Sequence, residues 1–362
     1  MRILLIITGL GMGGAERVVS NLADELVKMG HEVKIAYLTG EVLLPPKSSE
    51  VELIPIGISN AKDFVKAYIK LRSLVKKFKP DVVHSHMFHS NIMSRLLRLT
   101  IKIPRLVNTV HNTNEGGVNR TIAYRVTDSL TDFTTNVSEE AVKEYIIKKA
   151  VKTGRISAIP NGIDTDVFHF NLKSRYSKRE ELNLRNDKMI LCVGSLTEQK
   201  DYPNLFSAIA LLRESRQDFK VFIVGEGPLK DELSDKVKAL DIKDYFSFLG
   251  KRSDVNDLMS AADVYVMSSA WEGFGLVVAE AMACERLVVA TDCGGVGEVV
   301  GSNGLLVEPK NSILLSEELN KALDLSEGER ASIGIAARQQ IINNYSLEKN
   351  VRAYLNLYIN KY

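Results

Sequence analysis

The chain has 362 residues, of which 45% are hydrophobic and 25% charged, and this composition is typical of a globular protein rather than a disordered or fibrous one. Its length suits two domains of about 150 to 200 residues each. The net charge of +2 is moderate and no nucleic-acid-binding motif is recognisable, so we expect no nucleic-acid partner.

The first half of the chain repeats a strand, a loop and a helix. Residues 3–8 form an apolar run typical of a strand buried on both faces, residues 15–29 have helical spacing, and residues 33–38 form the next strand. Further strands are predicted at residues 82–84, 105–110 and 133–137. This alternation predicts an open parallel sheet.

The loop after the first strand, residues 9–14, has the G-x-G-x-x-G spacing of a dinucleotide-binding turn. Such a unit needs an acidic residue at the end of the second strand, about 20 residues later, whereas Glu41 lies further on, beyond a glycine. Residues 16–17 also place two large charged side chains where a pyrophosphate needs bare backbone. The loop therefore favours another interpretation, in which Gly13 and Gly14 let the backbone approach a phosphate or sugar, and a plain tight turn is the structural alternative.

Residues 61–80 predict a basic amphipathic helix. Such a helix can lie on an anionic membrane surface, or it can cover the sheet and leave a solvated lysine face. Positive charge is concentrated in the first half of the chain, which suits an anionic partner. The basic residues of the helix are Lys62, Lys66, Lys70, Arg72, Lys76, Lys77 and Lys79.

A domain boundary is predicted where the turn residues 159–164 are followed by a polar, charged run over residues 171–188. The pattern then restarts, with strands at 189–193, 220–224, 245–248, 263–267, 287–291 and 304–307. We therefore expect an α/β protein of two doubly wound, Rossmann-like domains, residues 1–163 and 164–345, with a ligand cleft between the carboxyl ends of their sheets. Residues 346–362, which contain a last amphipathic helix, are expected to pack back on the first domain.

The three cysteines, Cys192, Cys284 and Cys293, lie in or beside apolar segments without metal-ligand spacing, so we expect reduced core thiols. No apolar run approaches the roughly 20 residues that span a bilayer, and the N-terminal apolar run has no cleavage-like site. We therefore expect a cytoplasmic protein.

The strongest chemical signal is the turn Glu272-Gly-Phe-Gly275 between a predicted strand and a predicted helix. The backbone amides of Gly273, Phe274, Gly275 and Leu276 lie at the positive end of that helix, which is a site for an anion. Glu280 is unusual because nearly all its neighbours in the helix are apolar. A buried carboxylate needs a partner, which the two hydroxyls of a ribose would supply, as would a lysine or an amide of the protein itself.

Nearly the whole chain resembles the retaining glycosyltransferase family 4, which has the GT-B fold. The resemblance rests on the Glu272-x7-Glu280 spacing and on four shorter segments, residues 11–17, 160–164, 193–200 and 224–228. Each segment alone is a weak signal, whereas together they are specific to the family.

The resemblance implies a donor site in the second domain. Glu280 should bind the ribose of the donor, and Lys200 its diphosphate. Glu272 and the amides of Phe274 to Leu276 should hold the transferred sugar and the distal phosphate. Each of these residues matches a position of the family motif.

One residue of that site departs from the family pattern. Many members have an arginine where this chain has Ser195, next to Gly194, and that arginine pairs with the diphosphate. Its absence leaves Lys200 to neutralise more of the charge. Arg17 and Arg252 are the candidate substitutes.

In the first domain, the resemblance implies that Gly13 and Gly14 close over the phosphate. It also implies that His111, at the end of a predicted strand, lies beside the reacting sugar. A strand-end histidine taken alone is structural about as often as it is functional. The predicted catalytic residues are therefore Glu272, His111 and Lys200.

The implied reaction moves a hexose or N-acetylhexosamine from a nucleotide-diphosphate sugar, by family a UDP-sugar, to a glycan or lipid-linked glycan, with retention and an α-glycosidic bond. It belongs to the assembly of bacterial surface polysaccharide or glycoconjugate. No residue stands out as a nucleophile or strong base, which fits a front-face displacement with a stabilised leaving phosphate. We expect no cofactor and no metal, because Asp164-Thr-Asp166, which resembles a metal-binding carboxylate pair, lies in the predicted interdomain turn.

Several alternatives remain open: a GDP-mannose-dependent mannosyltransferase, a sugar-nucleotide epimerase, a nicotinamide-dependent dehydrogenase and a non-catalytic glycan-binding relative. Nicotinamide binding would favour the dehydrogenase, and donor binding without turnover would favour the glycan-binding relative. Bacterial members of the family often extend glycans on lipid carriers. This favours a peripheral location at the inner face of the cell membrane, through Lys62 to Lys79.

Overall fold

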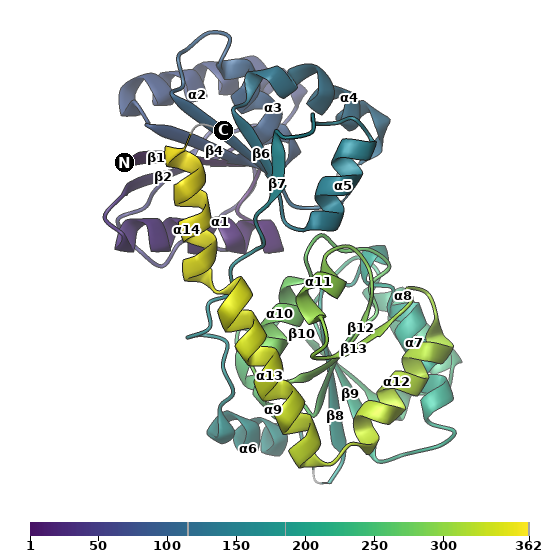
Figure 1. Cartoon of the computed structure of the whole chain (residues 1–362). Helices are drawn as coiled ribbons and strands as arrows, with labels where there is room; N and C mark the ends of the chain where they lie inside the picture. The colour runs from purple at the N-terminus through teal and green to yellow at the C-terminus, as the bar shows by residue number, and fades with distance from the viewer. Residues whose placement is uncertain (114–115, 185, 361–362) are drawn as a thin grey trace. The chain divides into compact units, whose positions relative to one another are not determined.

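The computed structural model describes residues 1–113, 116–184 and 186–360, and the chain folds into two units (Figure 1). The first unit contains Met1–Gly162 and the chain from Leu347 onward, and the second contains Ile163–Ser346. Each unit is a parallel sheet with helices packed against it, which confirms the predicted α/β class with two doubly wound sheets.

The first sheet has seven parallel strands in the order β3-β2-β1-β4-β5-β6-β7. Their bounds are β1 Arg2–Ile7, β2 Glu32–Tyr37, β3 Glu52–Pro55, β4 Val82–His86, β5 Arg105–Val110, β6 Phe133–Asn136 and β7 Ile156–Ala158. Strands β3 and β7 were not among the strands predicted from the sequence. Both are short edge strands with mostly half-buried or exposed side chains, so neither carries a continuous apolar run.

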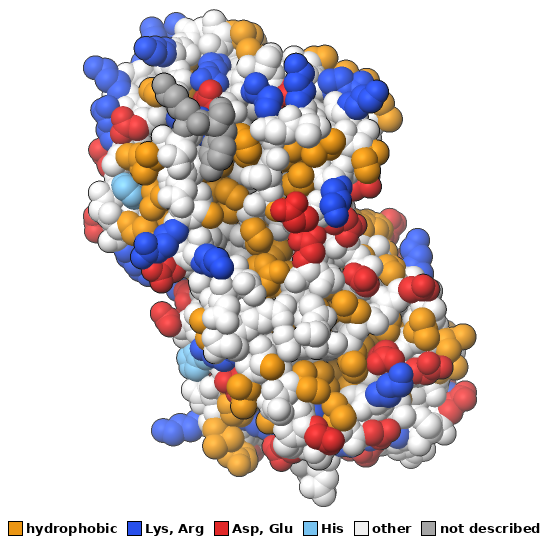
Figure 2. Space-filling view, in the orientation of Figure 1, with side chains coloured by type: hydrophobic (Ala, Val, Ile, Leu, Met, Phe, Trp, Pro, Cys, Tyr) orange, Lys and Arg blue, Asp and Glu red, His pale blue; other side chains and the backbone are white. Residues whose placement is uncertain are grey.

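The helices of the first unit are α1 Gly14–Lys28, η1 Ala61–Asp63, α2 Phe64–Phe78, α3 Phe88–Leu97, α4 Gly117–Thr127, η2 Asp128–Leu130, α5 Glu139–Ile147 and α14 Leu347–Ile359. Alternate residues of β1 face two helical layers. Ile3, Leu5 and Ile7 belong to the core with α1 and α14, whereas Leu4 and Ile6 belong to the core with α2 and α3. Burial on both faces explains the continuous apolar run. On the face in Figure 2, lysine and arginine side chains gather over this unit.

The second sheet has six parallel strands in the order β10-β9-β8-β11-β12-β13. Their bounds are β8 Lys188–Val193, β9 Phe219–Val224, β10 Phe246–Gly250, β11 Val264–Met267, β12 Leu287–Thr291 and β13 Leu305–Val307. All six were predicted from the sequence, with differences of a few residues at their ends.

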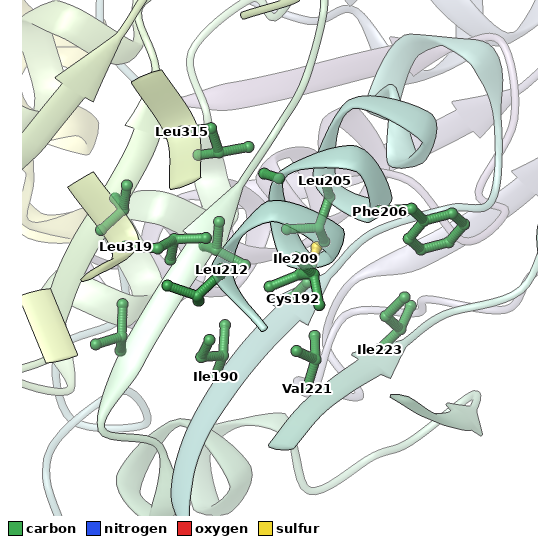
Figure 3. Packing of buried hydrophobic residues seen from close by; sticks show 14 of the residues in the cluster. Ile190, Cys192, Leu205, Phe206, Ile209, Leu212, Val221, Ile223, Leu315 and Leu319 are labelled. Atoms are coloured by element: carbon green, nitrogen blue, oxygen red, sulfur yellow. The ribbon is translucent and has the colours of Figure 1, made fainter. Parts of the chain in front are cut away.

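The helices of the second unit are α6 Leu172–Glu181, η3 Glu198–Lys200, α7 Tyr202–Leu212, α8 Lys230–Ala239, η4 Lys243–Tyr245, α9 Val255–Ala261, α10 Leu276–Ala283, α11 Val296–Val300, α12 Ser312–Asp324 and α13 Glu327–Tyr345. Figure 3 shows one core of this unit. Ile190 and Cys192 of β8 and Val221 of β9 pack with Leu205 of α7 and Leu315 of α12. This layer holds the carboxyl ends of the central strands in fixed positions.

The polar, charged run over residues 171–188 contains α6, which lies within the second unit although none of its side chains is buried. Arg175 and Arg179 of this helix form ion pairs with Asp263, at 2.6 and 2.9 Å. Asp263 is buried, so its charge requires these partners, and the helix is attached by ion pairs rather than by an apolar face.

Cys192, Cys284 and Cys293 are buried thiols rather than disulfides, as predicted. Burial raises the pKa of Cys192 and of Cys284 to about 12, so both remain protonated. Among the residues that the structure describes, no helix is both long enough and apolar enough to cross a bilayer.

Each sheet has one position at which the strand order changes direction. In the first unit it lies between β1 and β4, and in the second unit between β8 and β11. Ligands of open parallel sheets bind outside the carboxyl ends of the strands at such a position. The loops that follow these four strands are therefore where each unit is expected to hold a ligand.

Candidate functional site

In the second unit, the loops after β8 and β11 bring Lys200 and Glu272 together. The Lys200 ammonium forms an ion pair with the Glu272 carboxylate. That carboxylate also accepts hydrogen bonds from Ser269 Oγ at 2.8 Å and from Gln199 Nε2 at 3.3 Å. Glu272 is only 8% exposed. Two residues that the family resemblance assigned separately thus form one polar cluster at the predicted ligand position of the sheet.

Side chains fix the backbone on which this pair sits. Ser268 Oγ donates to the Lys200 carbonyl at 2.9 Å, which joins the loop after β11 to the loop after β8. Thr291 Oγ1, at the end of β12, donates to the Ser269 carbonyl at 2.6 Å. Hydrogen bonds therefore join the carboxyl ends of three neighbouring strands, and the Lys200–Glu272 pair lies on a preorganised backbone.

Glycine is required where the loops after β8 and β9 meet. Gly225 has a φ of +144°, and a Cβ there would lie 1.9 Å from the Gly194 carbonyl oxygen. A Cβ at Gly194 would lie 3.1 Å from Cε of Lys200. Gly194 thus leaves room for the Lys200 stem, while the neighbouring Ser195 is exposed.

The turn before α10 is packed against the loop after β12. Gly294 has a φ of +57°, and a Cβ there would lie 1.9 Å from the Glu272 carbonyl oxygen. The Gly295 amide donates to the Gly273 carbonyl at 3.1 Å. Gly275, with a φ of +82°, caps α10 without a side-chain hydrogen bond, and its carbonyl accepts from the amides of Val278 and Ala279 at 2.9 and 3.1 Å. The start of α10, which carries partial positive charge, thus follows the turn that begins at Glu272.

Three further predicted residues lie on or beside α10. Phe274 is buried, and its ring meets the edge of the Tyr345 ring at a centroid distance of 5.5 Å. Leu276 begins the helix and is half-buried. Glu280 is 4% exposed, in a helix whose other residues are apolar. The burial that its neighbours implied is therefore observed.

Arg252, a candidate substitute for the missing arginine, is held by carboxylates of its own. Its guanidinium contacts Asp254 at 2.6 Å and Glu181 at 2.8 Å, and these hydrogen bonds raise its pKa. It follows the edge strand β10, and β9 lies between that strand and β8. The structure thus attaches Arg252 to α6 and does not join it to Lys200.

Asp164 and Asp166 make the local turn that their spacing suggested. The amides of Asp166 and Val167 both donate to Asp164 Oδ1 at 3.2 Å. Within the ranges that the structure describes, no group of three or more histidine, cysteine or acidic side chains is placed to hold a metal ion.

In the first unit, the glycine loop follows β1 at the corresponding position of its sheet. Thr8 Oγ1 lies 3.0 Å from Ser90 Oγ, which joins this loop to α3. A Cβ at Gly13 would lie 2.3 Å from Oε2 of Glu16, so the Glu16 side chain folds over the start of α1. Burial raises the pKa of Glu16. The first turn of α1, in which Gly14 is exposed, thus carries the carboxylate of Glu16.

His111 belongs to a cluster of three histidines that the sequence analysis missed. His84 and His86 lie on the same face of β4, and His111 follows β5, the neighbouring strand. His86 Nδ1 is 3.1 Å from His111 Nε2. His84 is held by Tyr358 of α14 at 2.6 Å and by Thr109 at 2.7 Å. The signal in the sequence that could have revealed this cluster is the spacing of His84 and His86, two residues apart at the end of a strand.

Burial keeps these histidines uncharged at neutral pH. It lowers the pKa of His84 to about 3 and that of His111 to about 4. Burial, followed by the charges of the other two rings, lowers the pKa of His86 well below its usual value. The cluster can therefore donate or accept hydrogen bonds, but it supplies no positive charge.

Models of known protein families match the chain over both of its units. A family model described as "Glycosyl transferases group 1" matches residues 174–340, and one described as "Glycosyltransferase Family 4" matches residues 12–167. The two matches fall on the second and the first unit respectively.

Named relatives are similar over most of the chain. One is the UDP-Gal:alpha-D-GlcNAc-diphosphoundecaprenol alpha-1,3-galactosyltransferase of Escherichia coli, 28% identical over 84% of this chain and 81% of the relative. Another is the N-acetyl-alpha-D-glucosaminyl L-malate synthase of Bacillus anthracis, 26% identical over 96% and 94%. A solved structure from Anabaena, HepE in complex with UDP, has a TM-score of 0.85 at 20% identity and covers 99% of both chains.

Proposed function

Because the chain belongs to glycosyltransferase family 4 and is a glycosyltransferase of the GT-B fold, we propose that it uses a UDP-sugar as donor. It transfers a hexose or N-acetylhexosamine, with retention, to a glycan or lipid-linked glycan acceptor. The product carries an α-glycosidic bond. The reaction needs no metal and no cofactor.

One observation supports this proposal most directly. Lys200, Glu272 and the start of α10 all follow the carboxyl ends of two neighbouring strands, β8 and β11. When the bond between the anomeric carbon and the phosphate oxygen breaks, negative charge grows on the leaving diphosphate. An ammonium group and the free amides of a helix stabilise that charge without reorganisation. Glu272, an acceptor of hydrogen bonds, is suited to the hydroxyls of the transferred sugar.

The acceptor hydroxyl attacks the anomeric carbon from the face that the phosphate leaves. Its oxygen forms the new bond, and its proton passes to the departing phosphate oxygen. This route needs neither a protein nucleophile nor a strong base. His111, uncharged in its buried setting, serves as a hydrogen-bonding group beside the sugar, and Gly13 and Gly14 offer backbone to the phosphate.

The names of the relatives support the choice of donor and acceptor. The relative from Escherichia coli is named for UDP-Gal and for an acceptor on diphosphoundecaprenol, and the Anabaena structure holds UDP. Glu280, buried in α10, is the proposed ligand of the donor ribose. A GDP-mannose-dependent transfer is the second candidate, since the diphosphate and ribose contacts would be the same for both donors.

The single tryptophan of the chain, Trp271, provides a direct test. It precedes Glu272, is 46% exposed, and its carbonyl accepts a hydrogen bond from Gln199 Nε2 at 3.1 Å. We expect UDP to change its fluorescence at lower concentration than GDP, ADP or NAD, with and without a metal chelator. Tighter binding of GDP would favour the mannosyltransferase, and a response to NAD alone would contradict the proposal.

The anomeric configuration of the product completes the test. With a UDP-sugar and a lipid-linked acceptor, proton NMR should show an α-anomer as the first product, at a rate unaffected by chelator. A β-anomer would exclude retention. Binding of UDP-sugar without transfer to any acceptor would favour the glycan-binding relative.

A further inference from the structure

His86 and His111 form a pair in which one nitrogen of each ring contacts the other ring. Their near nitrogens, His86 Nδ1 and His111 Nε2, are 3.1 Å apart, and the ring centroids are 5.4 Å apart. His86 Nε2 and His111 Nδ1 are buried and have no hydrogen-bond partner among the residues that the structure describes. Buried polar atoms of this kind call for a ligand or a water molecule.

The position of His86 is strongly constrained. Its ring lies against that of His84, with a centroid distance of 4.0 Å, and its carbonyl accepts a hydrogen bond from Ser90 Oγ at 2.6 Å. The next residue, Met87, has φ 71° and ψ 159°, a conformation that is strained for a non-glycine residue. The Met87 amide is held by the Thr109 carbonyl at 3.2 Å. The chain thus keeps His86 at the end of β4 despite local strain.

A hydrogen bond between two uncharged imidazoles restricts both tautomers. If His86 Nδ1 carries the proton, it donates to an unprotonated His111 Nε2, and His111 must then carry its proton on Nδ1. If His111 Nε2 carries the proton, His86 Nδ1 is unprotonated and His86 carries its proton on Nε2. The two rings therefore always have the same tautomer, and their outer nitrogens always present one donor and one acceptor.

We propose that His86 is a positioning residue that sets the tautomer of His111. His111 Nδ1 then offers a ligand either a donor or an acceptor, according to the tautomer that the contact with His86 imposes. This inference deepens the proposed function, in which His111 lies beside a sugar, and rests on it for the identity of that ligand alone. The pairing of tautomers rests on the geometry of the two rings.

The test is the ring nitrogen spectrum of the full chain labelled with 15N-histidine. The chain has six histidines, so each signal can be assigned from a single substitution. We expect His86 and His111 to show the same tautomer, both protonated on Nδ1 or both on Nε2. Opposite tautomers in the unaltered protein would overturn the proposal, and this measurement requires no variant to fold.

Substitution then tests control of His111 by His86. His86→Phe should change the nitrogen shifts of His111 and lower kcat about tenfold or more, with a smaller change in KM for the donor, while His86→Gln should retain part of the rate. His89→Gln, on the exposed side of α3, is the control and should change neither. An unchanged His111 spectrum in His86→Phe would overturn the proposal. If no variant and no unaltered protein transfers sugar, the proposed function fails, yet the tautomer result still decides the pairing.

Discussion

The Lys200 ammonium and the Glu272 carboxylate neutralise each other in a setting where little of either side chain is exposed, 14% for Lys200 and 9% for Glu272. A donor diphosphate that binds Lys200 therefore competes with a carboxylate already in place. The pair would couple the two halves of a donor, because the group proposed to bind the phosphate is held by the group proposed to bind the sugar. This ion pair determines what we expect when either Lys200 or Glu272 is substituted.

Lys200→Ala should weaken UDP binding by at least about tenfold, equivalent to about 1.4 kcal/mol, and should leave uridine binding unchanged. The variant removes the cation and leaves the buried Glu272 charge near the phosphates, which adds repulsion. Calorimetric titration with both ligands measures the difference. Lys238→Ala, which removes an exposed lysine paired with Asp235 on α8, is the matched control. Equal losses for UDP and uridine would contradict a diphosphate role for Lys200.

Glu272→Gln should lower kcat by about 100-fold, the scale seen when one preorganised group is removed from an active site. UDP should bind at least as tightly as before, since Lys200 no longer shares its charge with a carboxylate. Steady-state rates and Trp271 fluorescence give the two quantities separately. Glu318→Gln, on α12 and paired with Lys321, serves as control. A loss of UDP affinity with an unchanged kcat would reverse the assignment.

Glu280→Gln should weaken UDP and uridine by a similar factor, because the ribose is common to both. A hydrogen bond to a charged group contributes about 1.5–3 kcal/mol, which corresponds to roughly 10- to 100-fold in affinity. The substitution keeps the shape of the side chain in the apolar helix. Calorimetry shows whether the ratio of the two affinities is preserved; a loss confined to UDP would place Glu280 at the diphosphate instead.

Local patterns were sufficient for the six strands of the second unit and for the turn and helix that carry Glu272 and Glu280, whereas Lys200 was assigned from the family resemblance. The strand ending at Met267, the turn at Glu272 and the helix with Glu280 could all be predicted from spacing and polarity. The contact between Lys200 and Glu272 could not be derived from local pattern, because it depends on β11 lying beside β8 rather than beside β10. Strand order is a property of the whole sheet.

Two features that could not be predicted have a common physical origin. The polar run over residues 171–188 contains Arg175 and Arg179, whose partner Asp263 is far away in the sequence. The histidine cluster was missed because the predicted strand stopped at residue 84, two residues before His86. In both cases, polar side chains are placed by tertiary contacts that composition does not reveal.

Residues 61–80 allow a direct test of membrane association. On α2, Val65 and Ile69 are 66% and 61% exposed, next to Lys66 and Lys70, while the opposite face is buried. An exposed apolar stripe with lysines beside it suits an anionic bilayer. We expect sedimentation with vesicles that contain phosphatidylglycerol, weakened by salt.

Paired charge reversals show whether α2 is responsible. Lys66→Glu combined with Lys70→Glu should abolish sedimentation with the vesicles, whereas the same change at Lys230 and Lys236 of α8 should not. Circular dichroism confirms that the fold is retained. Equal vesicle binding by both double variants would show that α2 only covers the sheet.

Asp263 links α6 to the second sheet, and its removal should destabilise that unit. Its carboxylate is bound by Arg175, by Arg179 and by the Met189 amide at 2.7 Å. Burial acts to raise the pKa of Asp263, but the ion pairs and the amide outweigh it, so the pKa lies below its usual value. A lowered pKa means that this contribution to stability is complete above the ordinary aspartate pKa of about 3.9 and is lost as the pH falls below it.

Asp263→Asn should therefore lower the free energy of unfolding at pH 7 by roughly 3–5 kcal/mol, the scale for a buried ion pair that loses one partner. Thermal unfolding of both proteins at pH 7 and at pH 3 measures this. The difference in Tm should shrink at the lower pH, because the unaltered protein has begun to lose the contribution of this charge there. Asp235→Asn, which breaks an exposed pair with Lys238, should leave Tm within a degree or two at both values. A gap in Tm that stays constant between pH 7 and pH 3 would show that shape, rather than charge, is what Asp263 contributes.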